Sequence, residues 1–189
     1  LFFAGGAAWL LIVTALQLPW LIDMSRERTA VVPLLRDDTV VSLLFFGFVM
    51  SFIFAVSLRT MPTFYARPMP GYAAVVPLWC ALNGGLALYL AGRLWQDYAD
   101  STETWPVNLG LALTGTALAA GALLTGGVQG VATRLRPSSR INALFLRSAA
   151  LWLLIAGGYL AYVAARGLAR GRPIAFTDLD AVRHMLALG

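Results

Sequence analysis

Five long apolar segments constrain the fold of this chain more than any other feature of its sequence. Their predicted bounds are Leu1–Ile22, Thr39–Thr60, Ala73–Trp95, Val107–Ala132 and Ala143–Ala165, and a sixth apolar segment starts near Leu179 and runs to Gly189. A helix needs about 20 mostly apolar residues to cross the hydrocarbon core of a bilayer. Long alternation of apolar and polar residues, which would predict a membrane barrel, is not seen. We therefore predict an all-α fold, a polytopic bundle of transmembrane helices.

The composition agrees with an integral membrane protein. The chain is 59% hydrophobic and 12% charged, whereas soluble domains contain about 25% charged residues. The predicted connections between the apolar segments are short and polar, so none of them holds a soluble domain. Residues 1–189 are thus predicted to form a single transmembrane helical domain, with five spans and the start of a sixth. Because both ends lie in apolar segments, we expect this domain to be part of a longer chain.

Charge is distributed unevenly over the predicted connections. All nine acidic residues lie in or beside the first, third and fifth connections. The second and fourth connections and the adjacent helix ends carry no acid but six arginines, which are Arg59, Arg67, Arg134, Arg136, Arg140 and Arg147. This favours a cytoplasmic position for the second and fourth connections. The rule counts basic residues only, however, and eight arginines at the other side leave the orientation open.

The basic residues predict membrane lipids as partners. All fourteen are arginines, and arginine at a helix end extends its guanidinium toward the headgroups. A basic groove interleaved with aromatic side chains, typical of nucleic-acid binding, is not visible. We predict contact with anionic lipid headgroups and no nucleic acid.

Small residues cluster in the predicted third, fourth and fifth spans. Examples are Gly84-Gly85, Gly110, Gly115 and Gly157-Gly158. Small side chains let helix backbones approach closely, so ordinary bundle packing is the main interpretation. The alternative is a groove left open for a flat cofactor.

His184 is the only histidine, and it lies within the sixth apolar segment. We expect Asp178 or Asp180 to cap this helix, with His184 about one turn inside it and on the buried side if Leu188 is also buried. Ionisable groups inside spans are scarce and often functional. His184 is therefore a candidate ligand of haem or copper, and the alternative is a hydrogen-bonded histidine at the interface. A second histidine ligand would have to come from outside this sequence.

Arg59 is the second candidate for a contact with a cofactor. It closes the second apolar segment, shortly before Pro62. An arginine at a helix C-terminus complements the helix dipole, which is the structural interpretation. The alternative is contact with an anion or a haem propionate, because the guanidinium matches a carboxylate.

Two segments share an arrangement of residues that indicates an internal repeat. Asp38–Gly47 and Asp180–Gly189 match at four of ten positions, which are Asp38/Asp180, Val40/Val182, Leu44/Leu186 and Gly47/Gly189, and Ser42 stands where the later segment has His184. The first segment continues through Gly47-Phe48-Val49 to Leu58-Arg59 and Pro62, and the later one reads Arg183-His184-x-Leu-x-Leu-Gly189. These segments resemble the NnrS family of bacterial multi-span membrane proteins, which contain haem and copper and are linked to nitric oxide stress. They are similar, more distantly, to the catalytic subunit of haem–copper oxidases.

The resemblance implies a haem- or copper-binding protein of the bacterial cytoplasmic (inner) membrane, active in respiration or nitric oxide stress. Its histidine ligand carries over only to His184, since Ser42 departs from the pattern. One alternative is a non-catalytic accessory subunit that packs against other subunits of a larger respiratory or photosynthetic membrane complex. Another is a small-solute transporter, although charge is scarce within the spans away from their ends. No catalytic residue is identified, and whether the chain is an enzyme stays open.

Overall fold

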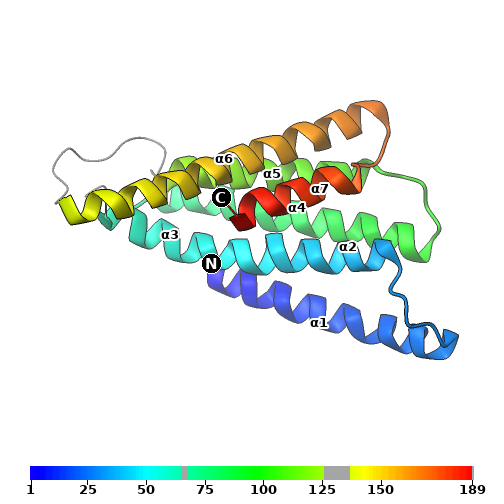
Figure 1. Cartoon of the computed structure of the whole chain (residues 1–189). Coiled ribbons are helices and arrows are strands. Elements are labelled where there is room, and N and C mark those ends of the chain that lie inside the picture. The colour runs from blue at the N-terminus through cyan, green and yellow to red at the C-terminus, as the bar shows by residue number, and fades with distance from the viewer. Residues whose placement is uncertain (65–67, 126–136, 189) are drawn as a thin grey trace.

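The computed structural model describes residues 1–64, 68–125 and 137–188, and this part of the chain folds into helices without strands (Figure 1). The second helix is continuous through α2, the π-helical turns η1 and α3. The elements are α1 (Phe2–Glu27), α2 (Leu34–Ser42), η1 (Leu43–Val49), α3 (Met50–Phe64), α4 (Tyr72–Tyr98), α5 (Trp105–Leu124), α6 (Pro137–Arg170) and α7 (Phe176–Leu188). The predicted all-α helical bundle is confirmed.

Five helices in the described part of the chain are long and apolar enough to cross a membrane, as in a multi-pass membrane protein. They cover Phe2–Glu27, Leu34–Thr63, Tyr72–Tyr98, Trp105–Leu124 and Leu144–Arg170. Each corresponds to one of the predicted spans, and the end of the predicted fourth span, residues 126–132, lies outside the described residues. The helix α7 corresponds to the sixth apolar segment, and its 13 residues make it about 20 Å long.

The second helix extends beyond the predicted end of its span at Thr60. Pro62 lies inside α3, which continues to Phe64. Pro62 has no N–H to donate to the Leu58 carbonyl, but the residues on either side of it stay helical. Near Pro62, Thr60 Oγ1 donates to the Val56 carbonyl and Thr63 Oγ1 donates to the Arg59 carbonyl.

The helices run back and forth, so that alternate connections meet at the same end of the bundle (Figure 1). Arg36 at the start of α2 contacts Asp97 at the end of α4, with 3.1 Å between Nε and Oδ2. Asn108 in the first turn of α5 donates to the Arg172 carbonyl after α6, over 2.8 Å. The first, third and fifth connections therefore lie together. We call this the acidic end, and the opposite end the arginine end.

Close contact between glycines packs α5 against both neighbours. A Cβ atom added to Gly110 would lie 2.5 Å from the Gly85 carbonyl oxygen of α4, and one added to Gly157 of α6 would lie 2.6 Å from the Ala119 nitrogen of α5. The interpretation as bundle packing is confirmed at these glycines. The alternative of an open groove is wrong there, because the backbone of the neighbouring helix fills the space.

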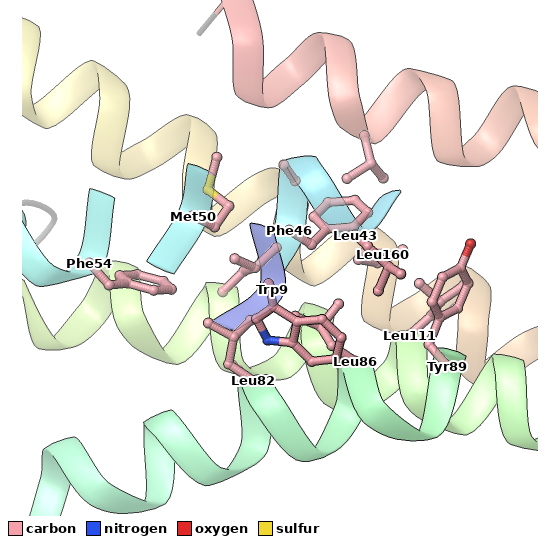
Figure 2. Packing of buried hydrophobic residues seen from close by; sticks show 14 of the residues in the cluster. Trp9, Leu43, Phe46, Met50, Phe54, Leu82, Leu86, Tyr89, Leu111 and Leu160 are labelled. Atoms are coloured by element: carbon pink, nitrogen blue, oxygen red, sulfur yellow. The ribbon is translucent and has the colours of Figure 1, made fainter. Parts of the chain in front are cut away.

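Large apolar side chains fill the interior between the second helix and α4, α5 and α6 (Figure 2). Phe46, Leu86 and Leu111 are fully buried. A polar contact joins α1 to α4 in the same layer, since Trp9 Nε1 donates to Asn83 Oδ1 over 2.8 Å. The core thus holds α4 in register with the second helix, and this register positions the polar residues described next.

Candidate functional site

A buried ionic network joins three helices near the acidic end. Asp38 Oδ2 lies 2.6 Å from Arg93 Nη2 of α4, and Asp38 Oδ1 lies 2.6 Å from Arg183 Nη2 of α7. The side chains of Asp38, Arg93 and Arg183 are only 6%, 15% and 10% exposed. Together with Ser42 and Tyr89, we call these residues the Asp38 network.

Helical spacing brings the members of the network together. Asp38 and Ser42 are separated by four residues along the second helix, and Tyr89 and Arg93 by four along α4, so each pair shares one face of its helix. Arg183 Nη2 also lies 2.6 Å from Ser42 Oγ and 3.2 Å from the Asp38 carbonyl oxygen. The Tyr89 hydroxyl donates to Asp38 Oδ2 over 3.4 Å and accepts from Arg93 Nε over 3.3 Å. The hydroxyl of Tyr89 points away from the apolar core in Figure 2.

The network contains one carboxylate and two guanidinium groups in a poorly hydrated place. Removing charges from water is costly, and the cost is offset only where the partners and hydrogen bonds are well placed. Arg183 is 8% exposed, and its Nε has no hydrogen-bond partner among the residues that the structure describes. Ionisable residues in membrane segments commonly mark functional sites. The Asp38 network is therefore both an anchor for α7 and a candidate site.

A small cavity reaches this network from the acidic end. It has a volume of about 210 Å³, and it is lined by Leu34, Leu35, Asp38, Arg93, Ile174, Phe176 and Leu179. The π-helical turns η1 begin directly after Ser42, and such irregular turns occur frequently at functional sites. The arrangement offers a polar wall of carboxylate and guanidinium to a small solute.

His184 lies on the outer face of α7, and its side chain is 65% exposed. Its Nδ1 is 2.9 Å from the Asp180 carbonyl oxygen. Because a carbonyl oxygen only accepts, a hydrogen bond here requires the proton on Nδ1, and the neutral imidazole in that tautomer carries its lone pair on Nε2. The structure places Arg183, not His184, among the buried side chains of α7, since Leu179 and Val182 turn the adjacent face toward the core.

The predicted cap of this helix is wrong. The helix α7 begins at Phe176, so both Asp178 and Asp180 lie inside it. Asp178 Oδ1 instead accepts a hydrogen bond from the Tyr159 hydroxyl of α6, over 2.8 Å. This contact attaches the start of α7 to α6. The side chain of Leu188, on which the expectation of a buried His184 depended, lies outside the described residues.

Arg59 lies in a different place, near the end of α3. It is exposed and lines a cavity of about 370 Å³, together with residues from the starts of α1 and α4. We call this the Arg59 cavity. His184 and Arg59 line no cavity in common among those described, so the structure does not bring the two predicted contacts together.

The described residues include no group of three or more His, Cys, Asp or Glu side chains that could hold a metal ion. Cys80 is free and exposed. Haem differs from a bare metal ion in this respect, because the macrocycle supplies four ligands and the protein adds only one or two. A single outward-facing histidine is thus better suited to haem than to copper.

The Asp38 network was not predicted from the sequence. Its three charged residues lie in or beside three different apolar segments. The sequence feature that could have indicated it is position. Asp38, Arg93 and Arg183 all lie within a few turns of the acidic end, and the charge of Asp38 is opposite to that of the two arginines. Ser42, which departs from the histidine pattern, proves to be a buried partner of Arg183.

No family model, curated protein or solved structure matches this chain. The resemblance of its two segments to the NnrS family stays a prediction. Function is argued below from the imidazole of His184, the Asp38 network and the two cavities.

Proposed function

We propose that this chain belongs to a bacterial inner-membrane protein that binds haem or copper through His184. The observation that supports this most directly is the hydrogen bond between Nδ1 and the Asp180 carbonyl, over 2.9 Å. Histidines that bind metals commonly donate their other N–H to a carbonyl or carboxylate, which fixes the ring and its tautomer. The Asp180 carboxylate, 3.6 Å from Nδ1, strengthens this arrangement.

The position of His184 indicates where the cofactor would bind. The imidazole faces outward from α7 rather than into the bundle, so a planar macrocycle would lie against the outer face of this helix. His184 is the only histidine. A second axial histidine would therefore come from outside this sequence, and copper would need further ligands from the same source. Arg59 remains a candidate propionate contact in such an assembly.

Replacing His184 by alanine tests the proposal. We expect His184→Ala to lose most of the haem absorbance near the Soret band, or most of the bound copper, per mole of purified protein. In the absence of cofactor the unfolding midpoint should change little, because a hydrogen bond at an exposed position contributes about 1 kcal/mol or less. With cofactor supplied, only the wild type should gain the further stability that a bound ligand gives. The matched control is Thr177→Ala, since Thr177 is another exposed polar residue of α7.

Two outcomes would contradict this proposal. One is a wild-type protein that contains neither cofactor when it is produced with haem and copper supplied. The other is an unchanged ratio of cofactor to protein in His184→Ala, which would favour the accessory-subunit alternative.

A second candidate function, transport of a small solute, is favoured by the cavity at the acidic end. Asp38 and Arg93 both line it, and charged residues within spans often mark solute pathways. A charge-preserving change separates the candidates. In a transporter, Arg93→Lys would impair uptake into proteoliposomes because ammonium does not reproduce the guanidinium contacts. If the protein instead binds its cofactor through His184, folded Arg93→Lys protein would contain the same ratio of cofactor to protein as the wild type.

A further inference from the structure

The cavity beside the Asp38 network lies where α2 and α7 begin and α4 ends, at the acidic end of the bundle (Figure 1). We call it the Arg93 cavity, because Arg93 is the basic side chain that lines it. Its volume is about 210 Å³, and it is open to the outside. A ligand with the volume of roughly seven water molecules would fit, and it could enter from the aqueous side of the membrane.

The hydrogen-bonding groups of the network that remain unused are donors. Both carboxylate oxygens of Asp38 already accept, Oδ1 from Arg183 and Oδ2 from Arg93 and Tyr89. A guanidinium carries five N–H donors, and three of those of Arg93 contact Tyr89, Asp38 and Gln96, so two remain. Nε of Arg183 likewise has no partner in the described part of the chain. A ligand that completes the network must therefore accept hydrogen bonds.

The charge of the network favours an anion as that ligand. Asp38 supplies one negative charge, whereas Arg93 and Arg183 supply two positive charges, because a guanidinium stays protonated. Both arginine side chains are mostly buried, and an uncompensated charge in such a place is costly. Asp38 is the only acid in the lining of the Arg93 cavity, and both its oxygens are engaged. An anion in this cavity would compensate the excess positive charge.

Two helix starts add to this preference. Leu34 and Phe176 are the first residues of α2 and α7, and both line the Arg93 cavity. The N–H groups in the first turn of a helix have no partner within it and carry partial positive charge, so an anion is stabilised there. The helix starts and the guanidinium of Arg93 thus favour the same kind of ligand.

The rest of the lining is apolar and defines the body of the ligand. It consists of Leu34, Leu35, Ile174, Phe176 and Leu179. A bare halide ion would leave this surface in contact with water, whereas an apolar group attached to the anion would cover it. A carboxylate has two oxygens that match the geometry of a guanidinium.

We propose that the Arg93 cavity binds a small monocarboxylate, whose oxygens accept hydrogen bonds from Arg93 and whose apolar group packs against Leu34, Ile174 and Phe176. This site does not rest on His184, which lies on the outer face of α7. It gives the transport alternative a class of solute. It is tested by binding alone, so a protein that binds the carboxylate without transporting it would still support it.

Equilibrium dialysis of the 189-residue chain in detergent, with radiolabelled benzoate as the probe, tests this proposal. Benzamide has nearly the same shape without the charge, and chloride has the charge without the apolar group. We expect saturable binding of benzoate, and at least tenfold weaker displacement by benzamide and chloride than by unlabelled benzoate. Arg93→Gln should weaken benzoate binding about tenfold or more, the usual contribution of a hydrogen bond between charged groups.

A second pair of variants leaves the Asp38 network intact. Leu34→Asp adds a negative charge to the wall of the cavity and should weaken benzoate binding about fivefold. It should not harm the fold, because Leu34 is exposed and an acid at a helix start is favourable. The matched control is Val31→Asp, at another exposed position that lines none of the cavities described. It should weaken binding much less, and unfolding midpoints show that each variant is folded.

Several results would overturn the proposal. Equal displacement by benzamide and benzoate would show that the cavity does not recognise the charge, and equal displacement by chloride would assign it to a bare anion. Benzoate binding that is unchanged in folded Arg93→Gln would remove the guanidinium from the site. If Arg93→Gln does not fold, the other pair decides, because equal losses in Leu34→Asp and Val31→Asp would indicate general repulsion at this end of the bundle.

Discussion

Replacing Asp38 by asparagine is expected to destabilise the bundle by about 3–5 kcal/mol, the usual effect of removing one partner from a buried ion pair. Asp38 contacts both Arg93 and Arg183 at 2.6 Å, so Asp38→Asn would leave two buried guanidinium groups without their carboxylate. The free energy of unfolding in detergent measures this loss. Hydrogen exchange should show α7 opening first, because Arg183 is its buried polar contact with the second helix.

The neighbouring residue provides the matched control. Asp37 is exposed and belongs to the same turn of α2, so Asp37→Asn should change stability by less than about 0.5 kcal/mol. Replacing all three charged members by apolar residues, as in Asp38→Leu with Arg93→Met and Arg183→Met, should recover most of the stability. Equal stability of Asp37→Asn and Asp38→Asn would show that the network is not a buried anchor.

Replacing Gly157 by alanine is expected to separate α6 from α5 at their closest contact. The new Cβ would lie 2.6 Å from the Ala119 nitrogen and 2.8 Å from the Gly115 carbonyl oxygen. These atoms belong to backbone and cannot move aside as a flexible side chain can. We expect a loss of about 1–3 kcal/mol, as for overpacking elsewhere, measured by unfolding in detergent.

The adjacent residue is an unusually close control for this change. A Cβ added to Gly158 meets nothing within 4 Å, and alanine is the better helix former. Gly158→Ala should therefore be neutral or slightly stabilising, although it differs from Gly157→Ala by one position. Similar effects of the two substitutions would mean that α5 and α6 do not pack as closely as the structure shows.

The Asp38 network also affects the proposed cofactor ligand. Arg183 and His184 are adjacent, so the contact that buries Arg183 sets the rotation of α7 and directs His184 outward. A weakened network would let α7 turn or detach. The expected consequence is that Asp38 variants lower the affinity of a cofactor held by His184, even though Asp38 lies on another helix.

The number and approximate extent of the long helices could be predicted from the sequence. The length of an apolar segment is a local property, and the thickness of a bilayer sets its minimum. The uneven distribution of acidic residues over the connections was also visible in the sequence. Because successive helices run in opposite directions, the connections with acids meet at one end of the bundle and those without acids meet at the other. The glycines and alanines of α5 also indicated close contact between helices, because the size of a side chain can be read directly from the sequence.

Which side of each helix faces its neighbours was decided only by the tertiary structure. Asp38 is 55 residues from Arg93 and 145 from Arg183, and no local pattern relates their rotations about three helix axes. Apolar residues surround most membrane helices, so their distribution gives little information on which face is buried. Thus His184, the most conspicuous residue of the sequence, lies on the outside, whereas the less conspicuous Arg183 lies inside. The register of α2, α4 and α7 placed it there, because a buried guanidinium is stable only beside a carboxylate.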